Sequence, residues 1–126
     1  MRRLAPVLAL LAFLAVASAP AAVPKPVTVE RYCSQTGDIC FGIFRKQGAI
    51  FLDLTAAAKY FDRYTLCVRT PKRTTTCRKF PLRRVGRFFA SHVRWHASFP
   101  PAGAGRYRVS WRLQRPLGPS LSFTLN

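Results

Sequence analysis

Acidic side chains are scarce in this chain of 126 residues, because Asp and Glu together number 4 against 21 Lys and Arg, which gives a net charge of +17. The four acids are Glu30, Asp38, Asp53 and Asp62, and they form no D-x-D or E-x-x-H pattern. Hydrolysis by paired carboxylates needs two carboxyl groups about 5 to 10 Å apart. Nothing local in the sequence predicts such a pair.

Motifs of common catalytic sites are also missing. The chain has no G-x-S-x-G turn, no glycine-rich phosphate loop and no dinucleotide-binding fingerprint. Its only histidines, His92 and His96, would share one face of a helix, but on a strand they lie about 13 Å apart, too far to hold one ion. The alternation around Val93 predicts a strand. We therefore expect a protein that is not an enzyme and that has no metal site and no cofactor; the alternative is a hydrolase whose site is not visible in the sequence.

Long apolar runs are absent beyond residue 16. Arg2 and Arg3 precede an apolar run over 4–16 that only Pro6 interrupts. A membrane-spanning helix needs about 20 apolar residues, whereas the apolar region of a signal peptide needs roughly 7 to 15. The run therefore predicts a cleaved signal peptide, with an uncleaved N-terminal anchor as the alternative. Small residues fit cleavage after Ala17 or after Ala21, and both positions remain open.

The expected organisation follows from that segment. We expect a signal peptide over 1–21, with cleavage between 17 and 22, an extended leader over 22–26 and one domain over 27–126. The protein is then secreted to the extracellular or cell-surface space and is not an integral membrane protein.

Cysteine is sparse but even in number, as expected for an oxidising compartment: Cys33, Cys40, Cys67 and Cys77. Three pairings are possible. Cys33 with Cys40 and Cys67 with Cys77 each flank a segment typical of a turn, so each pair would close one hairpin and stabilise it by roughly 2.5 to 3 kcal/mol. A structural zinc site is the competing interpretation, but C-x6-C and C-x9-C lack the spacing that lets neighbouring thiolates share an ion.

Period-two alternation dominates the rest of the chain and predicts about seven or eight short strands in an all-β antiparallel sandwich. One helix-like stretch over 55–61 predicts a short helical turn in a loop. Trp95 and Trp111 are expected in the core. The alternating positions of the expected strands are Val27, Val29, Arg31; Phe41, Ile43; Ile50, Leu52, Leu54; Tyr64, Leu66, Val68; Thr76, Arg78, Phe80; Val93, Trp95, Ala97, Phe99; Tyr107, Val109, Trp111, Leu113; and Leu121, Phe123, Leu125.

The segment 103–109 resembles the tyrosine corner of immunoglobulin-like and fibronectin type III-like domains, because Gly105 stands two residues before Tyr107. The resemblance implies that Tyr107 opens the penultimate strand and that its hydroxyl closes back on the preceding loop. The four cysteines depart from the antibody pattern, since they lie within hairpins and not between sheets, so a divergent sandwich and a small barrel both stay open. As a whole the chain is similar to an uncharacterised family of small exported bacterial proteins, a likeness that implies no function.

The basic residues carry the functional hypothesis. Arginine binds phosphate, sulfate or carboxylate groups through paired N–H donors, so we expect an anion-binding sheet face made of Arg69, Arg78, Arg94, Arg106, Arg108 and Arg112. The run Lys79, Arg83, Arg84 and Arg87 adds charge in the connection that follows.

The partner remains open. An anionic cell-surface polymer fits the arginines. The alternative is a structural or inhibitor-like secreted domain that binds a protein partner through its loops, and a merely solvated basic face is the third interpretation. Sequence-specific nucleic-acid binding is not expected, because no recognition helix is visible. Phe88 and Phe89 are interpreted as the start of the strand that contains Val93, with a membrane-touching tip as the alternative.

Overall fold

The computed structural model describes residues 12, 14–18 and 23–126. Most of the predicted signal peptide, including the second cleavage position at Ala21, lies outside these residues. Residues 23–26 lead without regular structure into the first strand. Over the described part of the chain, no helix combines the length and the apolar character needed to cross a membrane.

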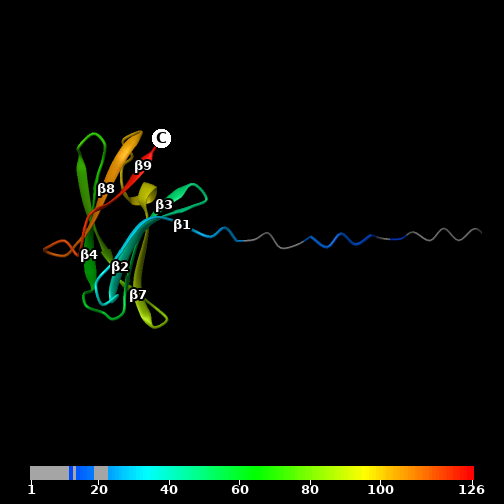
Figure 1. The fold of residues 1–126 in the computed structure, drawn as a ribbon, viewed down its shortest axis with the longest axis horizontal. Coiled ribbons are helices and arrows are strands. Elements are labelled where there is room, and N and C mark those ends of the chain that lie inside the picture. Colours follow the sequence, from blue (N-terminus) through cyan, green and yellow to red (C-terminus); the bar gives the residue numbers. More distant parts are fainter. Residues whose placement is uncertain (1–11, 13, 19–22) are drawn as a thin grey trace, which may run out of the picture.

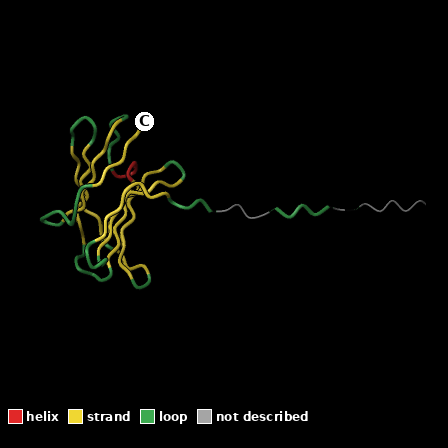
Figure 2. The backbone as a smooth tube through the Cα atoms, in the orientation of Figure 1, coloured by secondary structure: helices red, strands yellow, loops and turns green. Residues whose placement is uncertain are grey.

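Nine strands in the described residues form two sheets, and every strand pairing is antiparallel (Figures 1 and 2). The chain is therefore all-β, as predicted. The five-stranded sheet has the order β1 (Val27–Cys33), β2 (Ile39–Lys46), β3 (Ala49–Ala56), β7 (Phe88–Arg94), β6 (Arg83–Val85). The four-stranded sheet has the order β5 (Thr75–Pro81), β4 (Arg63–Arg69), β8 (Gly105–Arg112), β9 (Leu121–Leu125).

The core lies between the two sheets and is built from the alternating apolar positions. Phe41 of β2 stacks on Trp111 of β8 with ring centroids 4.5 Å apart, so side chains from opposite sheets meet directly. A second aromatic group joins Trp95, Tyr107 and Phe123, whose centroids lie 4.9 to 5.2 Å apart. Aromatic side chains bury large apolar areas, which matters for a domain of this size.

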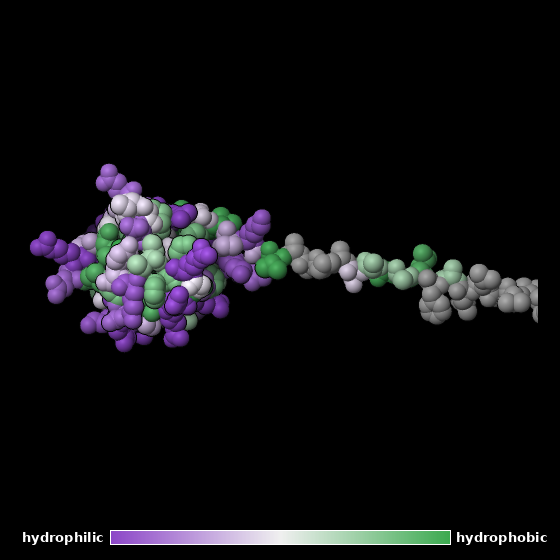
Figure 3. All heavy atoms as spheres, turned by 90° about the horizontal axis from the view of Figure 1, so that it is seen from below, coloured by the Kyte–Doolittle hydropathy of each residue, from purple (hydrophilic) through white to green (hydrophobic). Residues whose placement is uncertain are grey.

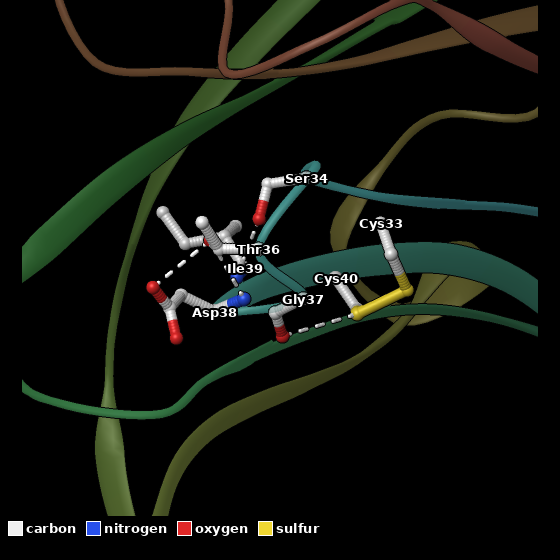
Figure 4. The surroundings of a disulfide bond; sticks show 7 residues. All are labelled: Cys33, Ser34, Thr36, Gly37, Asp38, Ile39 and Cys40. Atoms are coloured by element: carbon white, nitrogen blue, oxygen red, sulfur yellow. Dashed lines mark hydrogen bonds between the residues drawn. A yellow bond between two sulfur atoms is a disulfide. The ribbon is translucent and has the colours of Figure 1, made fainter.

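Two disulfides are present, and both close a hairpin as predicted. Cys33 lies opposite Cys40 in the β1–β2 pair, and Cys67 lies opposite Cys77 in the β4–β5 pair. In the first hairpin the Ile39 amide donates a hydrogen bond to the hydroxyl oxygen of Ser34 at 3.1 Å, which fixes the turn (Figure 4). Such disulfides are typical of oxidising compartments outside the cytosol.

The predicted strand through Val93, Trp95, Ala97 and Phe99 is wrong after residue 94. Strand β7 ends at Arg94, and the chain enters the single turn α1 (Trp95–Ser98) before it crosses to β8. Trp95 and Phe99 remain buried, while Ala97 is exposed, because the amide of Phe99 bonds to the carbonyl of Trp95 in helical i,i+4 spacing. Apolar residues that lie four apart fit both the period of two of a strand and one turn of a helix. The alternation alone therefore could not distinguish a strand from a helical turn.

Two further expectations at strand ends are also wrong. The stretch 55–61 forms no helical turn, because Thr55 and Ala56 continue β3 and pair with Ala90 and Phe89. Leu113 lies beyond the end of β8 and is exposed.

The first strand departs from simple alternation. A register shift between Thr28 and Glu30 places Glu30 opposite the buried Ile43, so Val27, Val29 and Arg31 do not share one side. The bulge lets the Glu30 carboxylate accept a hydrogen bond from the amide of Ser122 at 2.8 Å. This contact joins β1 to the edge of β9.

Candidate functional site

The outward side of the four-stranded sheet gathers basic side chains from three strands. Positions 64, 66 and 68 of β4 and positions 107, 109 and 111 of β8 are buried, so the residues between them point away from the core. The register extends this side onto β5. We call this surface the arginine face, and its basic members are Arg63, Arg69, Lys79, Arg106, Arg108 and Arg112.

Two arginines of this face are direct cross-strand neighbours. Arg69 of β4 lies opposite Arg108 of β8, and Arg106 follows two residues away on the same side of β8. Like charges directly opposite each other destabilise a sheet. Across the residues that the structure describes, the ion pairs are Lys59–Asp62 and His92–Asp53, so no carboxylate neutralises this arginine pair.

A hollow of about 310 Å³ opens beside this pair, lined by Arg69, Thr70, Pro71, Arg106 and Arg108. Its floor is fixed by close packing. A Cβ on Gly105 would lie 2.7 Å from Pro71 Cβ, and Gly105 has a φ of 129°, so only glycine fits there. Thr70 and Thr74 share a hydroxyl hydrogen bond of 2.7 Å across the β4–β5 turn. The arginines therefore surround a preorganised depression.

A second hollow of about 310 Å³ lies at the other end of β4 and is lined by Arg63, Tyr64, Thr65, Lys79, Leu113 and Gln114. The Cys67–Cys77 disulfide lies between the two hollows on the same side of the sheet. Arg63 and Arg69 are six residues apart on one strand, which corresponds to roughly 20 Å. The face thus offers two basic depressions to one extended ligand.

Each of the four acids has a hydrogen-bond or ion-pair partner other than the arginines of this face. Glu30 accepts from the Ser122 amide at the β9 edge, Asp38 accepts from Thr36, and Asp62 pairs with Lys59. Asp53 lies on the outward side of the other sheet, opposite His92. No described carboxylate forms an ion pair with the arginine face, although Glu30 lies beside Ser122, the residue opposite Arg108.

Two predicted members do not belong to the arginine face. Arg94 lies in β7 opposite Phe51, in the five-stranded sheet. Arg78 lies opposite the buried Leu66, so it is on the inward side of β5, and its side chain is exposed only because β5 is an edge strand. The structure brings together four of the six predicted arginines: Arg69, Arg106, Arg108 and Arg112.

The sequence analysis did not include Arg63 and Lys79 in the arginine face. For Lys79 the sequence did contain the necessary information. Once Cys67 and Cys77 are taken as directly opposite, counting two residues outward places Lys79 opposite Thr65. The same count places Arg78 opposite Leu66 and removes it from the face.

The histidines and serines form no nucleophile–base pair within the described residues. His92 Nδ1 lies 2.6 Å from Asp53 Oδ1, but Ser91, the next residue, faces the opposite side of β7 and accepts from the hydroxyl of Tyr64 at 2.7 Å. Burial raises the pKa of Asp53, and His92 partly opposes that shift. No group of three or more metal-ligating side chains occurs in the described part of the chain.

Comparison with protein-family models, curated proteins and solved structures finds no match for this chain.

Because the Tyr64 hydroxyl is buried, we expect the protein to lose stability at alkaline pH. Burial raises the pKa of Tyr64 from 10.0 to about 12, so its contribution to stability is fully present below pH 10 and is lost as the pH rises toward 12. The free energy of unfolding should fall by about 1.4 kcal/mol by pH 11 from this group alone. Urea unfolding at pH 9 and pH 11 measures the loss.

Tyr64→Phe should flatten this pH dependence, whereas Tyr60→Phe, which removes an exposed phenol, should leave it unchanged. Equal pH dependence in the wild type and Tyr64→Phe would contradict the prediction.

Proposed function

We propose that this chain is a secreted, non-catalytic domain of immunoglobulin-like β-sandwich type whose arginine face binds a linear anionic polymer at the cell surface. Polymers of this chemistry include phosphate-rich wall polymers, lipopolysaccharide and extracellular DNA. The proposal rests on the uncompensated pair Arg69 and Arg108 beside Arg106.

The sandwich assignment is supported by the packing of the two sheets through their inner faces and by the loop before β8. The Tyr107 hydroxyl donates to the Gly103 carbonyl at 2.7 Å and accepts from the Ala102 amide at 2.8 Å. A tyrosine corner makes this kind of contact. Secretion is supported by the apolar run over 4–16 and by the two disulfides.

Anion binding is supported by charge and by register together. A cross-strand pair of arginines lowers stability unless a counter-charge lies between them. A phosphate or sulfate group in the hollow supplies that charge and accepts paired N–H donors from guanidinium groups. The second hollow, roughly 20 Å along β4, favours a polymer over a single small anion.

Retention on immobilised polyanions across a salt gradient tests the proposal. The oxidised protein should elute from heparin, DNA and wall-polymer columns at a salt concentration that Arg108→Ala/Arg112→Ala lowers strongly. Each lost phosphate contact should reduce the slope of log affinity against log salt by roughly 0.7 to 0.9.

A matched control removes the same charge from the other sheet. Arg31→Ala/Arg94→Ala changes two exposed arginines of the five-stranded sheet and should lower retention far less. Equal losses in the two double variants would show attraction to net charge alone. Retention indifferent to salt would instead favour a protein partner bound through the loops.

A further inference from the structure

The β6–β7 hairpin ends in a pair of exposed apolar side chains. Val85 lies opposite Phe88 at the end of the hairpin, and the two residues are 60% and 59% exposed. Gly86, with a φ of 61°, and Arg87 form the turn between the strands. The hairpin projects at the lower end of the molecule, in yellow-green below the label of β7 (Figure 1).

This pair lies at the edge of the five-stranded sheet, where β6 has no further neighbour. The register from Asp53 and His92 places Phe88 on the outward side of β7, so the core does not take up its ring. Figure 3 views the molecule from the end at which the hairpin projects, and hydrophobic patches there are bordered by hydrophilic side chains. Leaving two apolar side chains in water forgoes the stabilisation that burial would bring.

The charge around this pair is positive. The hairpin contains Arg83, Arg84 and Arg87 and no acid. Arg84 donates from Nε to the Gly86 carbonyl at 3.2 Å, which ties its side chain to the turn. At the start of the hairpin the amide of Leu82 donates a hydrogen bond to the backbone carbonyl of Asp62. The carboxylate of Asp62 is already paired with Lys59 at 2.8 Å. We call residues 84–88 the hairpin tip. It combines apolar and cationic side chains and contains no acid that would neutralise them.

We infer that the hairpin tip docks on an anionic phospholipid bilayer, with Val85 and Phe88 entering the boundary between headgroups and acyl chains. Arginines reach lipid phosphates while their apolar stems remain at the interface. Apolar burial and attraction to anionic lipid together give peripheral membrane binding, whereas either alone gives a weaker association. This site is separate from the arginine face and does not rest on the proposed function.

Phe88→Trp provides a direct measurement of insertion. Trp95 and Trp111 are buried and supply a constant fluorescence background, so a change on adding vesicles reports residue 88. With phosphatidylcholine vesicles that contain phosphatidylglycerol, the added emission should move to shorter wavelength and should be quenched by brominated acyl chains. Pure phosphatidylcholine vesicles should produce little change.

Partition of variants to the same vesicles tests the apolar pair. Val85→Ser/Phe88→Ser should lower the partition coefficient about tenfold or more and leave retention on polyanion columns unchanged. The control Val27→Ser/Val29→Ser removes two exposed apolar side chains from β1, away from both the hairpin and the arginine face, and should partition like the wild type. Circular dichroism of both variants checks that they fold.

Two results would overturn the inference. One is sedimentation with anionic vesicles while the emission of Phe88→Trp stays that of a solvated indole, which would mean adsorption through the arginine face. The other is no binding to anionic vesicles at all, which would direct the search to a protein partner for the hairpin tip.

Discussion

Replacing Arg69 with glutamate is expected to stabilise the fold and to weaken polyanion binding at the same time. In the wild type Arg69 lies opposite Arg108, and like charges in such a pair are destabilising, whereas opposite charges stabilise a sheet by roughly 0.2 to 1 kcal/mol. Arg69→Glu should therefore raise the free energy of unfolding by about 0.5 to 1 kcal/mol, since the exposed position limits the gain. Urea unfolding at low salt measures this change.

The same substitution removes two contacts from the ligand, because the new carboxylate also engages Arg108. Hydrogen bonds to charged groups contribute about 1.5 kcal/mol or more each, so affinity for a polyanion should fall roughly 100-fold. Titration with a labelled polyanion at fixed salt measures the loss. A gain in stability together with this loss is expected when a residue serves a ligand at the expense of the fold.

Arg94→Glu is the matched control, because it makes the same charge change opposite Phe51 in the other sheet. It should change affinity only through net charge. If Arg69→Glu were no weaker in binding than Arg94→Glu, the arginine face would be a solvated surface and the proposed function would fail.

Sequence alone predicted what depends on local pattern. Alternation identified the strands around Leu52, Leu66 and Val109, because a buried face imposes a period of two wherever a strand is half-buried. The two disulfides could also be predicted from local pattern, because each pair of cysteines flanks a turn and each hairpin is formed by neighbouring segments of the chain.

The errors on Arg94 and on the strand after β7 arose where the relation between the two sheets decides the outcome. Arg94 alternates with buried residues as Arg108 does, but nothing in either segment states that β7 and β8 belong to different sheets. The helical turn α1, where the chain crosses from one sheet to the other, could not be recognised from the apolar pattern. A continued strand and a helical turn both bury Trp95 and Phe99. Composition shows how many arginines the chain has, but it does not show which of them lie opposite each other on paired strands.

Trp111→Ala is expected to have the largest effect on stability, a loss of about 3 to 5 kcal/mol. The side chain is 1% exposed and stacks on Phe41 of the opposite sheet at 4.5 Å, so its removal leaves a cavity between the sheets. Small domains are stable by only about 5 to 15 kcal/mol, so the variant should unfold at a much lower urea concentration. The midpoint and slope of the unfolding curve give the change.

Trp111→Phe separates packing from the polar atom. Within the described residues the indole Nε1 of Trp111 is buried without a hydrogen-bond partner, and such a group costs free energy that phenylalanine does not. Trp111→Phe should therefore lose much less stability than the alanine variant, because the ring against Phe41 is kept.

The binding properties of the two variants complete the argument. Trp111 lies on the core side of β8, whereas Arg108 and Arg112 lie on the outward side, so folded protein of either variant should keep the wild-type salt dependence on polyanions. Near-native stability of Trp111→Ala would mean that β8 does not pack on β2 through this residue. The floor beneath the arginine face would then not be the rigid sheet on which the spacing of its two hollows depends.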